Sequence, residues 1–105
     1  MQMDAMARMA EQVSCLMRTL AHPKRLLILC QLAERERSVG ELARLVGMKE
    51  PAMSQQLALM RREGLVSPRR DGQTLWYSLV SGDARDLLVY LHDKYCPTDG
   101  KEPAS

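Results

Sequence analysis

The sequence predicts one mainly α-helical domain that carries a single two-stranded β-hairpin. The chain has 105 residues, which is enough for one compact domain and too few for two. Apolar residues recur at steps of three and four positions over most of its length, as in helices packed on a core. Short apolar runs on both sides of the Asp-Gly pair at positions 71 and 72 indicate the hairpin. We expect the order ααααββα, in a domain of residues 1–97 followed by a flexible C-terminal tail, 98–105.

The first two helices are predicted over residues 4–20 and 23–35. Met and Leu side chains form one apolar stripe along the first helix, which suits ordinary core packing and a dimer interface equally well. Pro23 favours the start of the second helix, because the N–H that proline lacks has no helical partner in the first turn. Residues 26–32 are apolar nearly all round. The second helix is therefore expected to form the buried centre of the domain.

The next two helices are joined by a tight turn. Ser38, followed three residues later by Glu41, predicts a reciprocal cap at the start of the third helix. Gly47 can adopt the left-handed conformation that ends it. The fourth helix, predicted over 50–63, has small and amide-bearing side chains on its outer face. The side chains that it is expected to bury are Met53, Leu57 and Met60.

The remaining elements are the hairpin and one last helix. Strands are predicted over 65–69 and 74–80, on either side of the Asp-Gly turn. The last helix begins at Gly82 and is apolar on one side. It is expected to end near Cys96, because Pro97 cannot continue a helix without strain.

Composition points to a cytoplasmic protein without a membrane segment. No apolar run approaches the ~20 residues that cross a bilayer, and charges interrupt the first ten residues where a signal peptide would be apolar. Because cytoplasmic thiols are kept reduced, the three cysteines are not expected to form a permanent disulfide framework. They are Cys15, Cys30 and Cys96.

The net charge of +2 is unevenly distributed. Within segment 49–70 the basic residues outnumber the acidic ones, so the rest of the chain is slightly acidic. A local basic segment is typical of a surface that follows phosphates, although a solvated helix face has the same composition. The basic residues of the segment are Lys49, Arg61, Arg62, Arg69 and Arg70.

Two short helices joined by a glycine turn and followed by a basic hairpin make a winged helix-turn-helix, which places its second helix in the major groove of DNA. Amide and hydroxyl groups can donate to and accept from base edges, so Ser54, Gln55 and Gln56 are the candidate base-reading residues. A solvated helix face and a charged hairpin tip without a binding role are the alternatives. The other candidate DNA-binding residues are Lys49, Ala52, Arg61, Arg62, Arg69, Arg70 and Gln73.

Three stretches of the sequence resemble the ArsR family of winged-helix repressors, and the resemblance extends over residues 4–96. They are LAHPKRLLIL at 20–29, SVGELA at 38–43 and AMSQQLALMRREGLV at 52–66. The resemblance implies a homodimer built from the first and last helices. It also implies operator binding without inducer, and release when a metal, a metalloid or a reactive sulfur species is sensed. Lys49 and His22 depart from the Ser and Asp common in relatives, which weakens helix capping by about 1 kcal/mol at most.

The resemblance also bears on the inducer. Many metal-sensing relatives carry a Cys-x-Cys pair at the start of the third helix, but residues 36–41 contain no cysteine. Zinc-sensing relatives place Asp and His ligands along the last helix, where this chain has His92 without the expected pattern. The placement of Cys30 and Cys96 is similar to that in the persulfide-sensing branch, the BigR and SqrR type. In that branch the two thiols of one protomer become linked and DNA is released, which implies that Cys30 and Cys96 are the redox-sensing pair and that no cofactor or metal is needed.

Three other interpretations of the cysteines stay open. Cys30 can be an ordinary buried side chain and Cys96 an incidental thiol, and the apolar neighbours of Cys30 predict a raised pKa. A metalloid or soft-metal sensor could use Cys15, Cys30 or Cys96, because several thiolates suit such ions. A thiol-redox enzyme is the remaining alternative, but the sequence lacks both Cys-x-x-Cys and alternating strands and helices, so no enzymatic activity is expected.

Overall fold

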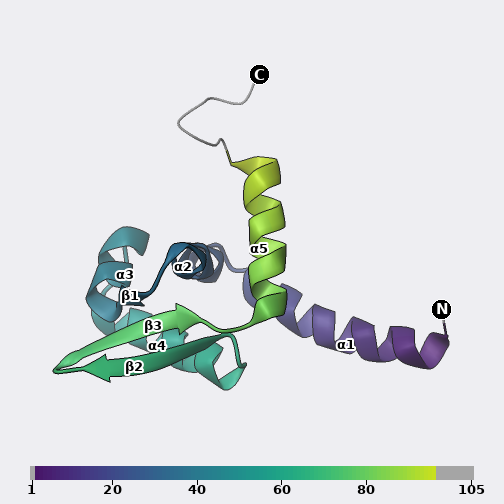
Figure 1. Cartoon of the computed structure of the whole chain (residues 1–105), viewed down its shortest axis with the longest axis horizontal. Helices are drawn as coiled ribbons and strands as arrows, with labels where there is room; N and C mark the ends of the chain where they lie inside the picture. The colour runs from purple at the N-terminus through teal and green to yellow at the C-terminus, as the bar shows by residue number, and fades with distance from the viewer. Residues whose placement is uncertain (1, 97–105) are drawn as a thin grey trace.

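The computed structural model describes residues 2–96, which form five α-helices and one three-stranded sheet. A compact body contains α2, α3, α4 and the sheet, while α5 stands beside it and α1 runs away from it (Figure 1). The mainly helical winged helix-turn-helix expected from the sequence is confirmed; the expected flexible tail, 98–105, lies outside the described residues. The elements are α1 (Met3–Leu20), α2 (Pro23–Glu34), β1 (Arg37–Ser38), α3 (Val39–Val46), α4 (Glu50–Arg62), β2 (Val66–Asp71), β3 (Thr74–Leu79) and α5 (Gly82–Tyr95).

The sheet is antiparallel, with the strand order β1-β3-β2. Strands β2 and β3 form the predicted hairpin, and Gly72 at its tip has the positive φ of 65° that its tight turn requires. The added strand, β1, was not expected from the sequence. It pairs Arg37 with Tyr77 and Ser38 with Trp76, and it is too short to show an alternating apolar pattern.

The start of α3 departs from the predicted reciprocal cap. The N–H of Glu41 donates to Ser38 Oγ at 3.1 Å, so the first half of the motif is present. The carboxylate of Glu41 does not return to Ser38 and instead accepts hydrogen bonds from Arg35 and Arg37. The cap prediction was therefore right about where α3 begins and wrong about the partner of Glu41, because two nearby guanidinium groups are stronger donors than a backbone N–H.

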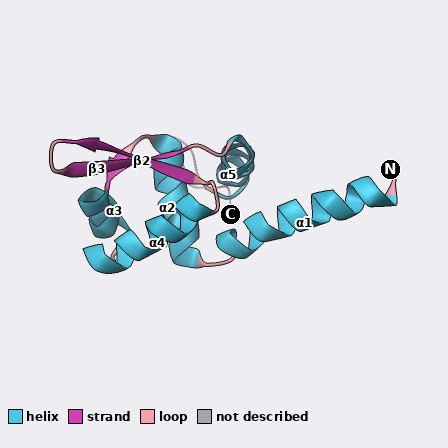
Figure 2. Cartoon of the chain, turned by 90° about the horizontal axis from the view of Figure 1, so that it is seen from below, coloured by secondary structure: helices cyan, strands magenta, loops and turns pink. Residues whose placement is uncertain are grey.

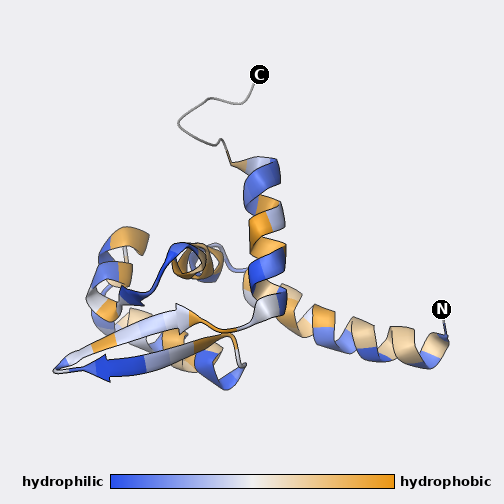
Figure 3. Cartoon of the chain, viewed as in Figure 1, coloured by the Kyte–Doolittle hydropathy of each residue, from blue (hydrophilic) through white to orange (hydrophobic). Residues whose placement is uncertain are grey.

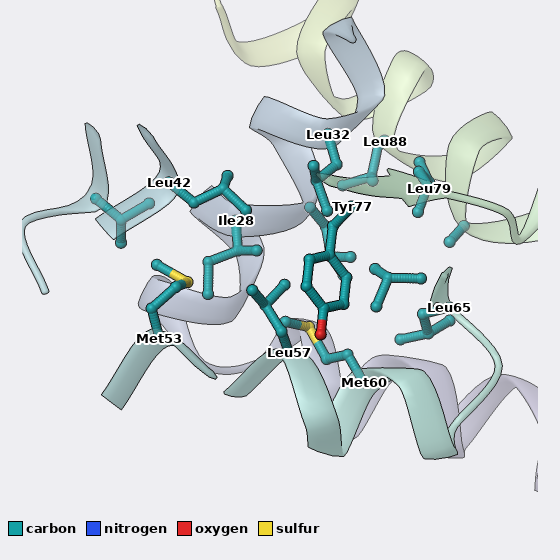
Figure 4. Packing of buried hydrophobic residues seen from close by; sticks show 14 of the residues in the cluster. Ile28, Leu32, Leu42, Met53, Leu57, Met60, Leu65, Tyr77, Leu79 and Leu88 are labelled. Atoms are coloured by element: carbon teal, nitrogen blue, oxygen red, sulfur yellow. The ribbon is translucent and has the colours of Figure 1, made fainter. Parts of the chain in front are cut away.

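The core lies between α2, α4 and the inner face of the sheet, and α5 closes one end (Figure 4). The predicted buried side chains of α4 are fully buried there, which holds the opposite face of that helix toward solvent. The labelled core residues are Ile28 and Leu32 of α2, Leu42 of α3, Met53, Leu57 and Met60 of α4, Leu65, Tyr77 and Leu79 of the sheet region, and Leu88 of α5.

Helix α1 projects from the body, as Figure 2 shows from below. The radius of gyration, 15.4 Å, therefore exceeds the value of about 13 Å for a compact 100-residue domain. Apolar side chains along α1 remain exposed, and Figure 3 shows hydrophobic residues recurring along the ribbon of this helix. None of the helices in the described part of the chain combines the length and hydropathy needed to cross a bilayer. The exposed stripe consists of Met3, Met6, Met9, Val13 and Met17.

Candidate DNA-binding surface and thiol pair

Helices α3 and α4 are held as a pair by contacts at their adjoining ends. The Nζ of Lys24 on α2 donates a 3.0 Å hydrogen bond to the carbonyl of Val46, at the C-terminus of α3. Gly47, with φ 78°, then ends α3 in the left-handed conformation. Helix α4 starts only a few residues later, with Lys49 as an N-cap that makes no side-chain cap hydrogen bond.

The outer face of α4 is polar and exposed. Its predicted DNA-binding side chains make no hydrogen bond or ion pair with any residue in 2–96, so their donors and acceptors face solvent. Such a surface can present amide, hydroxyl and cationic groups to a duplex. The residues concerned are Lys49, Ala52, Ser54, Gln55, Arg61 and Arg62.

Gln56 lies differently from the outward position expected for it. Its side chain is half-buried, and its Oε1 accepts a 2.7 Å hydrogen bond from Nε of Arg25 on α2. Just past the C-terminal end of α4, Oε1 of Glu63 accepts a 2.6 Å hydrogen bond from the buried hydroxyl of Thr19 on α1. These contacts fasten α4 to α2 and to α1, and they fix the angle at which its exposed face is presented.

The predicted residues of the wing, β2 and β3, fall into two groups. Arg70 and Gln73 are exposed near the hairpin tip and have no side-chain partner within the described chain. Arg69 instead forms a bidentate ion pair with Glu36, with Nε–Oε2 and Nη2–Oε1 distances of 2.8 Å each. Its guanidinium also lies 5.9 Å from the centroid of the Trp76 ring.

Cys30 and Cys96 come from distant parts of the chain, on α2 and at the C-cap of α5. Cys30 is half-buried and Cys96 is exposed, and both are free thiols. Burial raises the pKa of the Cys30 thiol, and the negative charges of Cys96 and Glu34 raise that pKa further. Helix α5 packs against α2, so the two cysteines lie on neighbouring helices.

Cys15 lies apart from this pair, exposed on α1. Its Sγ accepts a hydrogen bond of 3.1 Å from Nη2 of Arg18, one turn further along the same helix. Across residues 2–96, no group of three or more His, Cys, Asp or Glu side chains is arranged to hold a metal ion. The three thiols thus do not gather into one cluster within the chain.

Sequence reasoning missed a buried ion-pair network at the end of α2. The guanidinium of Arg37 is almost fully buried and donates to the carbonyl of Gln31 at 3.0 Å. It also pairs with Glu34 at 2.7 Å and with Glu41 at 3.0 Å. The run of alternating charges at 34–37 was a signal for it, because oppositely charged neighbours at short spacing commonly pair. The network joins the end of α2 to the first turn of α3.

Comparison with known proteins agrees with this architecture. Residues 22–67 match the family model described as bacterial regulatory protein, arsR family. The biofilm growth-associated repressor of Agrobacterium fabrum is 39% identical over 94 residues, which cover 90% of this chain and 80% of the relative.

Solved structures match over nearly the whole fold. Reduced HlyU from Vibrio cholerae superposes with a TM-score of 0.86 at 37% identity, covering 90% of this chain and 100% of that one. A homodimeric winged helix-turn-helix DNA-binding domain from Mycobacterium bovis, a possible ArsR-family regulator, matches with a TM-score of 0.74 at 32% identity, covering 89% of this chain and 86% of that one.

The family match spans α2 to the start of β2, which includes both helices of the helix-turn-helix. The alignments with the relatives cover 90% of the chain, and so reach into α1 and α5 as well. Their sequence identities, 39% and 37%, are higher than those of proteins that share only a fold. The ArsR family acts by binding DNA and has no enzymatic activity. The chain belongs to the ArsR family of bacterial regulatory proteins and is a DNA-binding transcriptional repressor related to the biofilm growth-associated repressors.

Proposed function

We propose that this repressor senses reactive sulfur species through Cys30 and Cys96, and that bridging of the two thiols releases its operator. The observation that carries the proposal is the packing of α5 against α2, which places the two cysteines on neighbouring helices. The charge of Cys96 is also one of the causes that raise the pKa of Cys30. The DNA contacts would come from the exposed face of α4 and from Arg70 and Gln73 of the wing.

The proposal includes a homodimer built on α1 and α5. The apolar stripe of α1 is exposed in the single chain, and α5 adds Val89 and Tyr90 as exposed apolar side chains. A second copy that covered these surfaces would remove apolar area from water. Two-fold symmetry would then present two copies of α4 to successive major grooves, about one helical turn apart. The homodimeric relative from Mycobacterium bovis supports this arrangement.

The two thiols have different parts in the proposed reaction. Cys96 is exposed and attacks the outer sulfur of an organic persulfide, R–S–SH, forming Cys96–S–SH and releasing the thiol RSH. The Cys30 thiolate then attacks Sγ of Cys96, forming the Cys30–Cys96 disulfide and expelling hydrogen sulfide. Two thiols are thus oxidised by two electrons, and one persulfide is reduced to RSH and hydrogen sulfide. Further persulfide would leave one or more extra sulfur atoms in the bridge.

The thiol pair has a physical connection to the DNA-binding helices. Cys30 and Glu34 lie one turn apart on α2, and Glu34 pairs with Arg37, which in turn pairs with Glu41 in the first turn of α3. A bridge that pulls α2 toward the end of α5 would strain this network. Because α3 packs on α4, such strain would change how α4 is presented to DNA.

The experiment measures operator binding and intact mass on the same samples. A duplex selected from a random library supplies the operator, and glutathione persulfide and As(III) are the two inducers. We expect persulfide to release the DNA and to yield a cross-linked peptide containing Cys30 and Cys96. Cys30→Ser should bind DNA and ignore persulfide, while Cys15→Ser, the matched control, should respond like the unaltered chain.

Each contrary outcome has a distinct meaning. Normal release of Cys30→Ser by persulfide would remove Cys30 from the mechanism. A stable arsenic adduct, with release by As(III) and not by persulfide, would replace the sulfur sensor by the metalloid sensor that the sequence left open. Loss of the response in Cys15→Ser would show that the third thiol is needed.

A further inference from the structure

We propose that Glu36 and Arg69 form a strap across the outer face of the wing, and that Arg69 is a positioning residue withheld from DNA. This inference rests on the proposed DNA-binding function and gives Arg69 a different role from the DNA contact expected from the sequence. Glu36 then helps to determine specificity, because it neutralises a cation that would otherwise attract any duplex.

The pleat of β2 separates Arg69 from Arg70. Successive side chains of a strand point to opposite faces of the sheet. Val66 is buried and Pro68 is half-buried, so the inner face of β2 continues to Arg70. Arg69 therefore lies on the outer face, where its cross-strand partner is Trp76.

The strand order makes the ion pair a strap. Because the order is β1-β3-β2, the strand that carries Trp76 lies between Arg69 and the segment just before β1. Glu36 stands in that segment and accepts both hydrogen bonds from Arg69. The side chain of Arg69 thus crosses β3 beside the Trp76 ring and fastens the wing to the loop that follows α2.

Glu36 and Arg69 neutralise each other's charge in the strap. The hydrogen bond from Arg69 holds the pKa of the Glu36 carboxyl below its usual range, so Glu36 stays ionised near neutral pH. A DNA phosphate that captured Arg69 would leave this carboxylate unpaired beside a polyanion. Arg70 has no such competing partner among residues 2–96.

The test is the salt dependence of binding to a duplex of scrambled sequence, measured for Glu36→Gln, Arg69→Gln and the double variant. Release of Arg69 in Glu36→Gln should tighten this binding and steepen the slope of log K against log salt by about 0.9 per protomer. Arg69→Gln should keep the unaltered slope, and adding Glu36→Gln to it should leave that slope unchanged, because no cation is released. A second readout is the emission of Trp76, the only tryptophan of the chain, which both single variants should change without DNA.

Two patterns of salt dependence would overturn the inference. A slope that falls by about 0.9 per protomer in Arg69→Gln, with no change in Glu36→Gln, would make Arg69 a phosphate contact. An equal effect of Glu36→Gln with and without Arg69 would reduce the result to a general effect of charge. If the unaltered chain bound no duplex, the proposed function would fail together with the DNA-binding part of this inference. Trp76 emission unchanged in both variants would refute the strap alone.

Discussion

Nε of Arg25 donates a 2.7 Å hydrogen bond to the amide oxygen of Gln56, whereas the neighbouring Gln55 is exposed. The two adjacent glutamines, Gln55 and Gln56, thus have different surroundings on α4. The amide oxygen of Gln56 is occupied by a cation of α2, and the amide of Gln55 is available to a ligand. This difference separates the base-reading candidates that the sequence treats alike.

Gln55→Ala should weaken operator binding by about 1 to 3 kcal/mol and leave binding to a scrambled duplex almost unchanged, because a base-edge contact is specific to sequence. Gln56→Ala is the matched comparison and should reduce the ratio of operator to scrambled affinity less, since its oxygen is held by Arg25. Fluorescence anisotropy with both duplexes measures the two ratios. Equal losses on both duplexes for Gln55→Ala would exclude base reading by this residue.

Arg37→Met should lower the free energy of unfolding by about 2 kcal/mol or more. Breaking a buried ion pair typically costs about 3–5 kcal/mol, but Glu34 is mostly exposed and can be solvated when its partner is lost. Arg35→Met removes the other guanidinium bonded to Glu41 and should cost less than about 1 kcal/mol, because that side chain is largely exposed. Urea unfolding at one protein concentration compares the two, and equal costs would contradict the role given to the buried pair.

The Arg37 network was not predicted, whereas several other features of the fold were. Apolar periodicity fixed the helices and the residues that α4 buries, because a spacing of three and four residues leaves few ways to cover an apolar face. Turn chemistry at Gly47 and Gly72 located the ends of α3 and of the hairpin strands. These features depend on near neighbours in the chain.

The features that escaped prediction depend on partners distant in sequence. Strand β1 exists because Arg37 and Ser38 meet β3, and the wing cation Arg69 is engaged because Glu36 lies across the sheet from it. Nothing in the pattern around Gln56 indicates that Arg25 would hold it. Composition could name the cations and amides of the candidate surface, but only the packed chain shows which of them are already bonded.

Val13→Glu should convert the proposed dimer into monomers. Val13 lies on the exposed apolar stripe of α1, and a carboxylate there would have to be desolvated in an interface built on that stripe. Glu11→Gln, on the same helix but outside the stripe, is the control and should keep the oligomeric state. Sedimentation velocity of both variants checks this. If the Val13→Glu variant still sediments as a dimer, the interface lies elsewhere.

Alkylation of Cys30 should be slow at neutral pH and still increasing at pH 9. The pKa of this thiol is raised by burial first and then by the charges of Cys96 and Glu34, and only the thiolate reacts. Cys96→Ser removes one of those charges, so Cys30 should react faster in that variant at pH 8, while burial keeps part of the shift. Rates with iodoacetamide, followed by peptide mass spectrometry, provide the comparison.

The same shift predicts how stability depends on pH. Because the folded-state pKa of Cys30 lies above its unfolded value, its contribution is fully present below the unfolded pKa and is lost as pH rises through the folded one. The free energy of unfolding of the reduced chain should therefore decline in alkaline solution, and that of the Cys30→Ser variant should decline less.

The alkylation rates also test the order of attack. A Cys30 thiol that reacts with iodoacetamide as fast at pH 7 as at pH 9 would mean a lowered pKa. Cys30 could then attack persulfide first, which would reverse the order of attack proposed for the two cysteines.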